Sequence, residues 1–443
     1  MFIFAPRQNK EIFLFASDVT PAVRAYAKTL EDKSIIYAPN PAPGNKPIAV
    51  GHAYSVLACM PEKSSTSHFP WVVPLSIDRV STDEKGHEVG PRQLCKLIND
   101  SSLPFNHSLC VHVADTAYFT LPIREMNSTV DNLVSIARLR SNRIVYAPPG
   151  ETGRKKYAQK MKLNEPEMHT QPDKTVEIDT STSKNRPITV IIKVWNNQLL
   201  RGNRQFKGHE NPFNLYQICV FDKTTQKKLF KRPMWLAVDG KRRHEIEAKS
   251  VYESYRQRYD IEHFFRFGKQ KLLMASFQTP DVIHEEKWWQ IVQLAYTQLY
   301  LSRDVCQLIP NPWERYLAKF KQPAEQDSAT MVSPSLAQRY FSKILEQIGT
   351  PAKDVRKVKP GNGRKEGDKQ EKRTISPTIF KTSKEKTKEK KESSDEISGF
   401  EKQPDSPNPK KIEDLIGALK NWLSEIKISK NELLLMLEKE LPA

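Results

Sequence analysis

The stretch Tyr255-Arg-Gln-Arg-Tyr-Asp-Ile-Glu-His-Phe-Phe-Arg-Phe-Gly-Lys269 carries the most informative spacing in this chain. Four of its residues stand at positions i, i+3, i+7 and i+14: Tyr255, Arg258, Glu262 and Lys269. With about 3.6 residues per turn, these positions lie near one stripe of a helix. An aromatic hydroxyl and two cations then flank one carboxylate. We expect this layout where a carboxylate holds a metal ion beside phosphate groups, although a solvated helix face is the simpler alternative.

Two aspartates each follow an apolar run that predicts a buried strand. Residues 11–17 end at Asp18, and residues 109–114 end at Asp115. If these strands are neighbours, both carboxylates lie at one edge of a sheet, where the helix can lay Glu262 across them. Three carboxylates in one place repel one another unless cations neutralise them, and such hard oxygen ligands suit Mg²⁺ or Mn²⁺. Taken alone, each aspartate is more simply a turn or helix-cap residue.

A carboxylate set of this kind indicates chemistry at phosphorus. Two metal ions about 4 Å apart can hold the attacking and leaving oxygens of an in-line displacement, which is how DNA strands are cleaved and joined. Asp260 is a rival for the third carboxylate. It lies two residues from Glu262, about 200° around the helix, so both cannot point into one site. The basic stripe selects Glu262.

Composition favours a polyanionic partner. The chain has 443 residues, a formal net charge of +18 and a pI of about 9.5, which points to nucleic acid first and an anionic membrane surface second. Its five cysteines form no Cys-x-x-Cys pair, so neither a zinc ribbon nor a disulfide framework is indicated. No apolar run is long enough to span a bilayer, and the N-terminus lacks the order of a signal peptide. We therefore predict an intracellular protein without membrane partners.

The order of predicted elements is typical of a mixed α/β sheet. Strands are expected over 11–17, 47–54, 70–75, 109–114 and 132–140, and a helix over 89–97. After a polar stretch over 156–184, further strands are expected over 187–195, 215–221 and 229–238, and helices over 244–271, 287–308 and 333–349. Residues 353–391 carry 15 Lys and Arg against 6 Asp and Glu, which predicts a disordered tail that grips phosphates or merely solubilises the chain.

The spacing Tyr-x2-Arg-x3-Glu-x6-Lys resembles the signature of a cut-and-paste group of bacterial insertion-sequence transposases of the DDE type. Residues 15–18 and 113–118 resemble the segments around that family's first and second aspartates. Residues 40–48 and 139–143 also resemble family segments, and the resemblance spans roughly residues 8–360.

The resemblance implies an α/β, RNase H-like core with a β-rich insertion. The expected parts are listed in chain order: core over 1–145, insertion over 146–243, core with the Glu-bearing helix over 244–310, helical extension over 311–352, disordered basic linker over 353–411 and amphipathic helices over 412–443. Relatives carry a helical DNA-binding domain before the first catalytic strand. Because Met1 lies seventeen residues before Asp18, we expect that domain to be missing here.

The resemblance also implies roles. Asp18, Asp115 and Glu262 would be the catalytic ligands of two divalent ions, Mg²⁺ or Mn²⁺. Three neighbours would hold DNA phosphates: Tyr255, Arg258 and Lys269. An insertion tryptophan, Trp195 or preferably Trp235, would stack on a base flipped out of the duplex, with a core aromatic as the alternative.

These roles predict a transposase that cleaves DNA and transfers strands during movement of an insertion sequence. Its partners would be double-stranded DNA at element ends and target, and a second copy in a synaptic homodimer, in the bacterial cytoplasm at the nucleoid. A truncated, catalytically idle DNA-binding remnant is the alternative. A general RNase H-like nuclease is a third, which would explain the acidic residues but not the Tyr, Arg and Lys neighbours.

Overall fold

The computed structural model describes most of the chain up to residue 306 and two later segments. The described ranges are 12–38, 46–63, 69–149, 156–182, 186–204, 206–306, 332–349 and 372–380. The predicted helices over 412–443, and the predicted linker over 353–411 apart from residues 372–380, lie outside them. No helix within these ranges is long and apolar enough to cross a bilayer.

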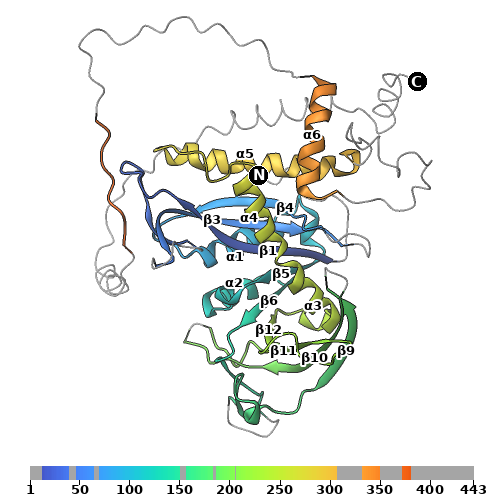
Figure 1. Ribbon diagram of the computed structural model, residues 1–443. Helices are drawn as coiled ribbons and strands as arrows, with labels where there is room; N and C mark the ends of the chain where they lie inside the picture. Colours follow the sequence, from blue (N-terminus) through green and yellow to red (C-terminus); the bar gives the residue numbers. More distant parts are fainter. Residues whose placement is uncertain are drawn as a thin grey trace, which may run out of the picture. The chain divides into compact units, whose positions relative to one another are not determined.

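A ten-stranded mixed sheet forms the centre of the described structure (Figure 1). Its strands are β1 (Ile12–Val23), β2 (Ser34–Tyr37), β3 (Ile48–Met60), β4 (Val73–Val80), β5 (Leu109–Ala114), β6 (Leu133–Leu139), β9 (Lys174–Ser181), β10 (Pro187–Gln198), β11 (Phe213–Asp222) and β12 (Met234–Asp239). The order is β2-β3-β1-β5-β6-β12-β11-β10-β9, and β4 also pairs with β3. β1, β5 and β6 run parallel, and every other pairing is antiparallel. β7 (Ile144–Tyr146) and β8 (Lys160–Lys162) form a separate ribbon.

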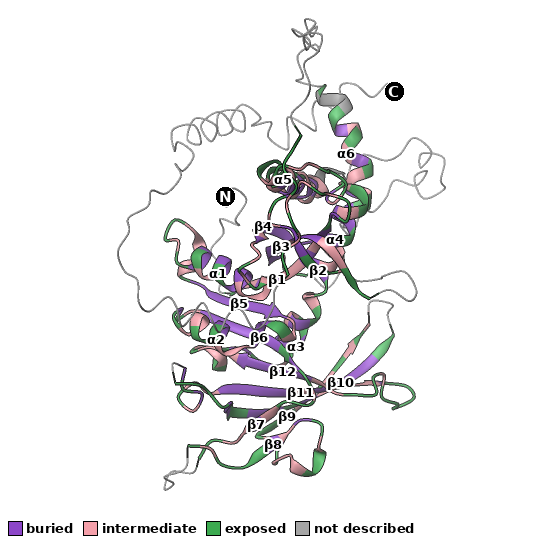
Figure 2. Ribbon diagram, turned by 90° about the vertical axis from the view of Figure 1, so that its left-hand side faces the viewer, coloured by how far each residue is buried: buried purple, intermediate pink, exposed green. Residues whose placement is uncertain are grey.

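Helices cover both faces of the sheet because its central strands are apolar on both sides. The α-helices are α1 (Gly86–Ile98), α2 (Leu121–Ser128), α3 (Ala248–Gln257), α4 (Asp260–Lys271), α5 (Val282–Cys306) and α6 (Pro334–Ile348). Short 3-10 turns occur at Pro104–Asn106, Thr116–Tyr118, Pro166–Met168 and Arg243–Glu245. Figure 2 shows the strands between these layers buried along much of their length.

Alternation along β1 separates the two cores. Phe13 and Phe15 pack with Leu94 of α1, whereas Ala16 shares the opposite core with Phe264 of α4. Successive strand residues point to opposite faces, so the even-numbered residues of β1 look toward α4. On that side Trp289 of α5 is also buried, stacked on a tyrosine of β3 with ring centres 4.0 Å apart. This parity decides which face receives Asp18.

The mixed α/β class is confirmed, and the arrangement fits the RNase H-like core that the resemblance implies. Several element boundaries differ from prediction. Asp18 does not end its strand, because β1 stays paired with β3 as far as Val23. The polar stretch over 156–184 contains β9, whose exposed alternate residues suit an edge strand. The predicted helix over 244–271 is two helices, α3 and α4.

The strands predicted as an insertion continue the central sheet. β12 pairs antiparallel with β6, from Trp235 opposite Leu139 to Asp239 opposite Ser135, and β11, β10 and β9 follow outward. This side of the sheet is therefore one hydrogen-bonded surface from β6 to β9. The division of the chain at residues 145 and 243 stays a prediction.

Candidate active site

The sheet brings the two predicted aspartates to the same level. β1 and β5 are parallel neighbours, with Ala16 opposite Val113. Two residues further along each strand, the same register reaches Asp18 and Asp115. Both keep the parity of residues that pack against α4, so both carboxylates belong to that face. The predicted adjacency of the two strands is confirmed.

The third carboxylate comes from α4, which crosses this face beside β1 (Figure 1). Arg258 links the parts: its Nη2 donates to Oε1 of Glu262 at 2.8 Å, and its Nη1 lies 3.8 Å from Oδ2 of Asp18. One guanidinium therefore partly neutralises two carboxylates that are far apart in the sequence. Asp115 caps the following 3-10 turn by accepting from the amide of Ala117 at 2.8 Å, so the cap interpretation holds for it as well.

A break in the helix sets the position of Arg258. Residues 258 and 259 form a turn between α3 and α4, where the amide of Arg258 bonds to Tyr255 and that of Ile261 bonds to Arg258. Such hydrogen bonds, from the amide of one residue to the carbonyl three residues earlier, tighten a helix locally. The stripe is therefore spread over two helices. Tyr255 is buried on α3, with the Arg258 guanidinium carbon 5.8 Å from its ring centre, and Lys269 is half-buried near the end of α4.

Asp260 takes no part in this cluster. It is 6% exposed, and its Oδ2 lies 2.6 Å from Nζ of Lys63, in the loop after β3. Asp260 and Glu262 therefore form separate ion pairs, and the choice of Glu262 as the third carboxylate stays a prediction.

Burial dominates the electrostatics at Asp18, and repulsion from the neighbouring carboxylates adds to it. Burial, with repulsion from Asp115 and Glu262, raises the pKa of Asp18 to about 6, despite the backbone bond from Val19 and the attraction of Arg258. Burial also lowers the pKa of Lys269 to about 8. The hydroxyl of Tyr118 is buried without a hydrogen-bond partner in the described structure, and burial raises its pKa, with Asp18 and Asp115 contributing.

The donor set fits a divalent cation, although the present arrangement is closed around Arg258. Among the described residues, no group of three His, Cys, Asp or Glu side chains is gathered closely enough to bind one ion. The site nevertheless offers only carboxylate oxygens, and a cation would remove the repulsion from Asp115 and Glu262 that adds to burial in raising the pKa of Asp18. Hard ions such as Mg²⁺ suit these ligands better than soft ones.

Asp18→Asn should stabilise the metal-free protein above pH 6. The pKa of Asp18 in the folded state is about 6, against 3.8 for an ordinary aspartate, so the folded state binds the proton more tightly. Stability contributed by this group therefore falls as the pH rises from about 4 to about 6, and asparagine removes the penalty. We expect a gain on the order of 1–3 kcal/mol at pH 7 and almost none near pH 4, measured by urea unfolding with EDTA.

The control for that measurement is Asp131→Asn, which changes an aspartate whose side chain is 81% exposed. It should shift stability by less than about 0.5 kcal/mol at both pH values. A loss of stability in Asp18→Asn at pH 7 would show that its attraction to Arg258 outweighs burial and repulsion.

A comparison with models of known protein families identifies the family of this chain. The family model described as a transposase DDE domain matches residues 73–298. The chain belongs to the family of DDE-domain transposases. The matched range holds Asp115, Glu262 and the basic stripe, and it begins after Asp18. A comparison with curated proteins found no match.

A basic cleft lies beside the second aspartate of this transposase. Its volume is about 260 Å³, and it is lined by Thr116, Arg138, Leu139, Arg140, Ser141, Arg232, Pro233 and Trp235. The three arginines are exposed, and Arg138 is near enough to Tyr255 to lower that tyrosine's pKa, which burial raises overall. The basic exit of the strand over 132–140 was visible in the sequence. Arg232 was missed, because only strand pairing brings it to β6.

Trp235 sits in the wall of this cleft and is only 1% exposed. Its ring lies 5.7 Å from that of Trp195 and 5.3 Å from that of His169, within one apolar core. The Nε1 of Trp235 has no hydrogen-bond partner among the described residues, whereas that of Trp195 donates to Thr170. Both tryptophans are core residues in this arrangement, so stacking of Trp235 on a base stays a prediction that requires the wall to move.

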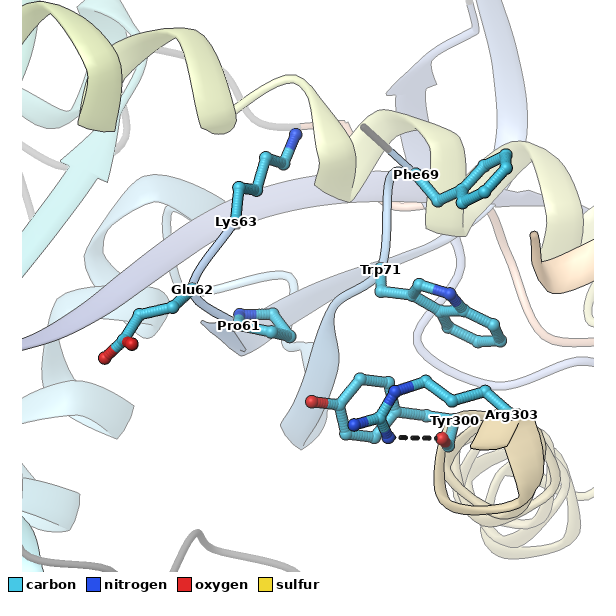
Figure 3. A pocket seen from close by; sticks show the side chains of 7 residues that line it. All are labelled: Pro61, Glu62, Lys63, Phe69, Trp71, Tyr300 and Arg303. Atoms are coloured by element: carbon cyan, nitrogen blue, oxygen red, sulfur yellow. Dashed lines mark hydrogen bonds between the residues drawn. The ribbon is translucent and has the colours of Figure 1, made fainter. Parts of the chain in front are cut away.

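A second, smaller cleft is lined by Pro61, Glu62, Lys63, Phe69, Trp71, Tyr300 and Arg303 (Figure 3). Trp71 meets Tyr300 edge-on at 5.6 Å, and the guanidinium of Arg303 lies 3.9 Å from the centre of the Tyr300 ring. Nη1 of Arg303 also donates to the carbonyl of Tyr300 at 2.6 Å. The contact between Trp71 and Tyr300 packs α5 against the segment before β4. These residues therefore serve packing of the fold.

Proposed function

We propose that this chain is a metal-dependent transposase that cleaves DNA at the ends of an insertion sequence and joins the 3′-hydroxyl to a target. The carrying observation is the level placement of Asp18 and Asp115 on parallel strands, with Glu262 tied to Asp18 through Arg258. The family match supports the transposase part. Assignment to the cut-and-paste group rests on the spacing from Tyr255 to Lys269.

Asp18, Asp115 and Glu262 would hold two divalent ions, Mg²⁺ or Mn²⁺. When bound, such ions stabilise the attacking and leaving oxygens of an in-line displacement. Arg258 holds the carboxylate cluster together before the ions and DNA arrive. Its forked donors then suit a phosphate beside the scissile bond.

Lys269 is suited to receive a phosphate. Burial lowers its pKa to about 8, and no ion pair of this lysine occurs among the described residues. An incoming phosphate would return the full charge to the ammonium, because an opposite charge favours the ionised form. The buried hydroxyl of Tyr255, beside Arg258, would contribute a neutral hydrogen bond.

The basic cleft would bind the part of the DNA strand that extends beyond the carboxylates. Arg138, Arg140 and Arg232 carry three exposed cations next to Thr116, which follows Asp115 directly. Cations in such a groove bind backbone phosphates irrespective of sequence. Trp235 would reach a flipped base from the same cleft. Double-stranded DNA, a synaptic homodimer and a cytoplasmic, nucleoid-associated location belong to the same proposal.

A DNA-binding remnant without catalysis is the second candidate, and one observation favours it. The Arg258–Glu262 ion pair at 2.8 Å closes the cluster, so it must open before all three carboxylates can share ions. The remnant would bind DNA with strong salt dependence and would not cleave it.

The test is cleavage of a duplex that carries the element's terminal repeat, with Mg²⁺ or Mn²⁺ present. Wild type should nick at the repeat boundary, and Asp115→Asn should abolish cleavage and strand transfer while the DNA dissociation constant changes by less than about threefold. Asp131→Asn is the matched control and should stay active. Binding without cleavage in the wild type would favour the remnant, and joint loss of binding and cleavage in Asp115→Asn would contradict its role as a ligand.

A further inference from the structure

A segment of the basic tail lies along the open edge of the sheet. Residues 372–380, orange-red in Figure 1, run beside β2, and Ser34 and Ile379 form a parallel bridge. The amide of Ser376 donates to the carbonyl of Lys28 at 3.1 Å, and that of Ile379 donates to the carbonyl of Lys33 at 2.9 Å. The tail composition predicted disorder, yet this segment, which we call the strap, is held by main-chain hydrogen bonds.

The side chain of Lys33 also holds the strap. Its Nζ donates to three carbonyls: Ala27 at 2.8 Å, Lys28 at 2.7 Å and Ser376 of the strap at 2.6 Å. Lys33 is only 5% exposed. A lysine ammonium has three donors, and a buried charge is costly unless each is satisfied. Two acceptors come from the loop before β2, and the strap supplies the third.

Recognition by this edge depends on the backbone of the strap more than on its side chains. Ile375 is 70% exposed and Phe380 is 62% exposed, so neither is inserted into a pocket. Strand addition of this kind draws its affinity from main-chain hydrogen bonds. It also covers the beginning of an edge strand, and exposed strand edges otherwise invite pairing with other chains.

We propose that the β2 edge, anchored by Lys33, is a docking site for an extended peptide, and that the strap of the same chain occupies it. The strap belongs to the same compact unit as the sheet, Met1–Lys381. Docking thereby tethers the cationic tail to the catalytic unit at a fixed point. The contacts that hold the strap involve none of the residues proposed for catalysis.

Hydrogen exchange of the full chain, followed by mass spectrometry, tests the proposal. Peptides covering the strap should exchange at least about tenfold more slowly than the same sequence as a free peptide. Ile379→Pro removes the amide N–H that donates to the carbonyl of Lys33. Because the side chain of Ile379 is exposed, this change should release the strap without disturbing the fold. Ile375→Pro is the matched control, because the described contacts show no bond from that amide to the sheet, and its protection should persist.

Lys33→Met provides a second, independent disruption from the receptor side. It should raise strap exchange to within about twofold of the free peptide, while β1 and β5 keep their protection. Free-peptide exchange in the wild type would overturn the docking. Protection that falls when the protein is diluted tenfold would mean that a second copy supplies the strap, which would overturn the tether within one chain.

Discussion

Glu262→Gln should reduce metal-dependent cleavage by about 10³-fold or more, because it removes a charged oxygen ligand while keeping the shape of the side chain. Glu262 is the only one of the three proposed ligands that is carried by a helix, and its partner Arg258 also contacts Asp18. DNA affinity should hold or rise slightly, since one negative charge leaves the surface that faces phosphates. Cleavage is measured with a terminal-repeat duplex, and binding by titration of the same duplex in EDTA.

Asp260→Asn is the sharpest control, because it changes a neighbouring carboxylate on the same helix. Asp260 pairs with Lys63 on another side of α4 and should be dispensable for chemistry. We expect its cleavage rate to stay within about fivefold of wild type once folding is verified by thermal unfolding. Equal loss in both variants would contradict the assignment of Glu262, and loss only in Asp260→Asn would reverse it.

Glu285→Ala should lower the free energy of unfolding by about 3–5 kcal/mol, because it leaves the buried guanidinium of Arg24 without its counter-charge. Glu285 is fully buried in α5. Its Oε2 accepts from Arg24 at 3.0 Å, and its Oε1 lies 2.9 Å from both His52 Nδ1 and the hydroxyl of Tyr54. Burial alone would raise the pKa of Glu285, but these partners lower it, so the carboxylate is charged when folded.

Urea unfolding at pH 7 checks this expectation, with Glu286→Ala as the matched control. Glu286 is the next residue of the same helix, but its side chain is 37% exposed and pairs with Arg79 at 2.8 Å. Its loss should cost less than about 1 kcal/mol. A cost below about 1 kcal/mol for Glu285→Ala as well would mean that water or a neighbouring group replaces the lost carboxylate.

The residues of the candidate active site show what spacing along the chain can predict and what it cannot. Spacing along the chain identified the stripe and excluded Asp260, because helix geometry is local. It also predicted one helix where the structure has two, since the tight turn at residues 258 and 259 depends on packing against the sheet. Asp18 was expected at a strand end, but antiparallel pairing of residues 19–23 with residues 51–55 of β3 prolongs β1 beyond it.

Tail composition misled for a different reason. Residues 353–391 are strongly cationic, and composition-based reasoning weighs side chains only. The strap is held through main-chain amides and carbonyls, and every residue except proline carries both groups. The pattern of side chains therefore cannot predict that this segment docks. The partner that makes docking favourable, the buried ammonium of Lys33, lies more than three hundred residues earlier in the chain.

By itself, the sequence determined the mixed α/β class, the three carboxylates proposed as ligands and their basic neighbours, because periodicity and spacing are properties of short segments. Tertiary structure alone decided that Asp18 and Asp115 lie level and that Arg258 joins Asp18 to Glu262. It also decided that arginines near the paired strands β6 and β12 share one cleft and that the strap docks at the start of β2. These features depend on the register between distant segments, which hydrogen bonding and core packing set only when the whole sheet assembles.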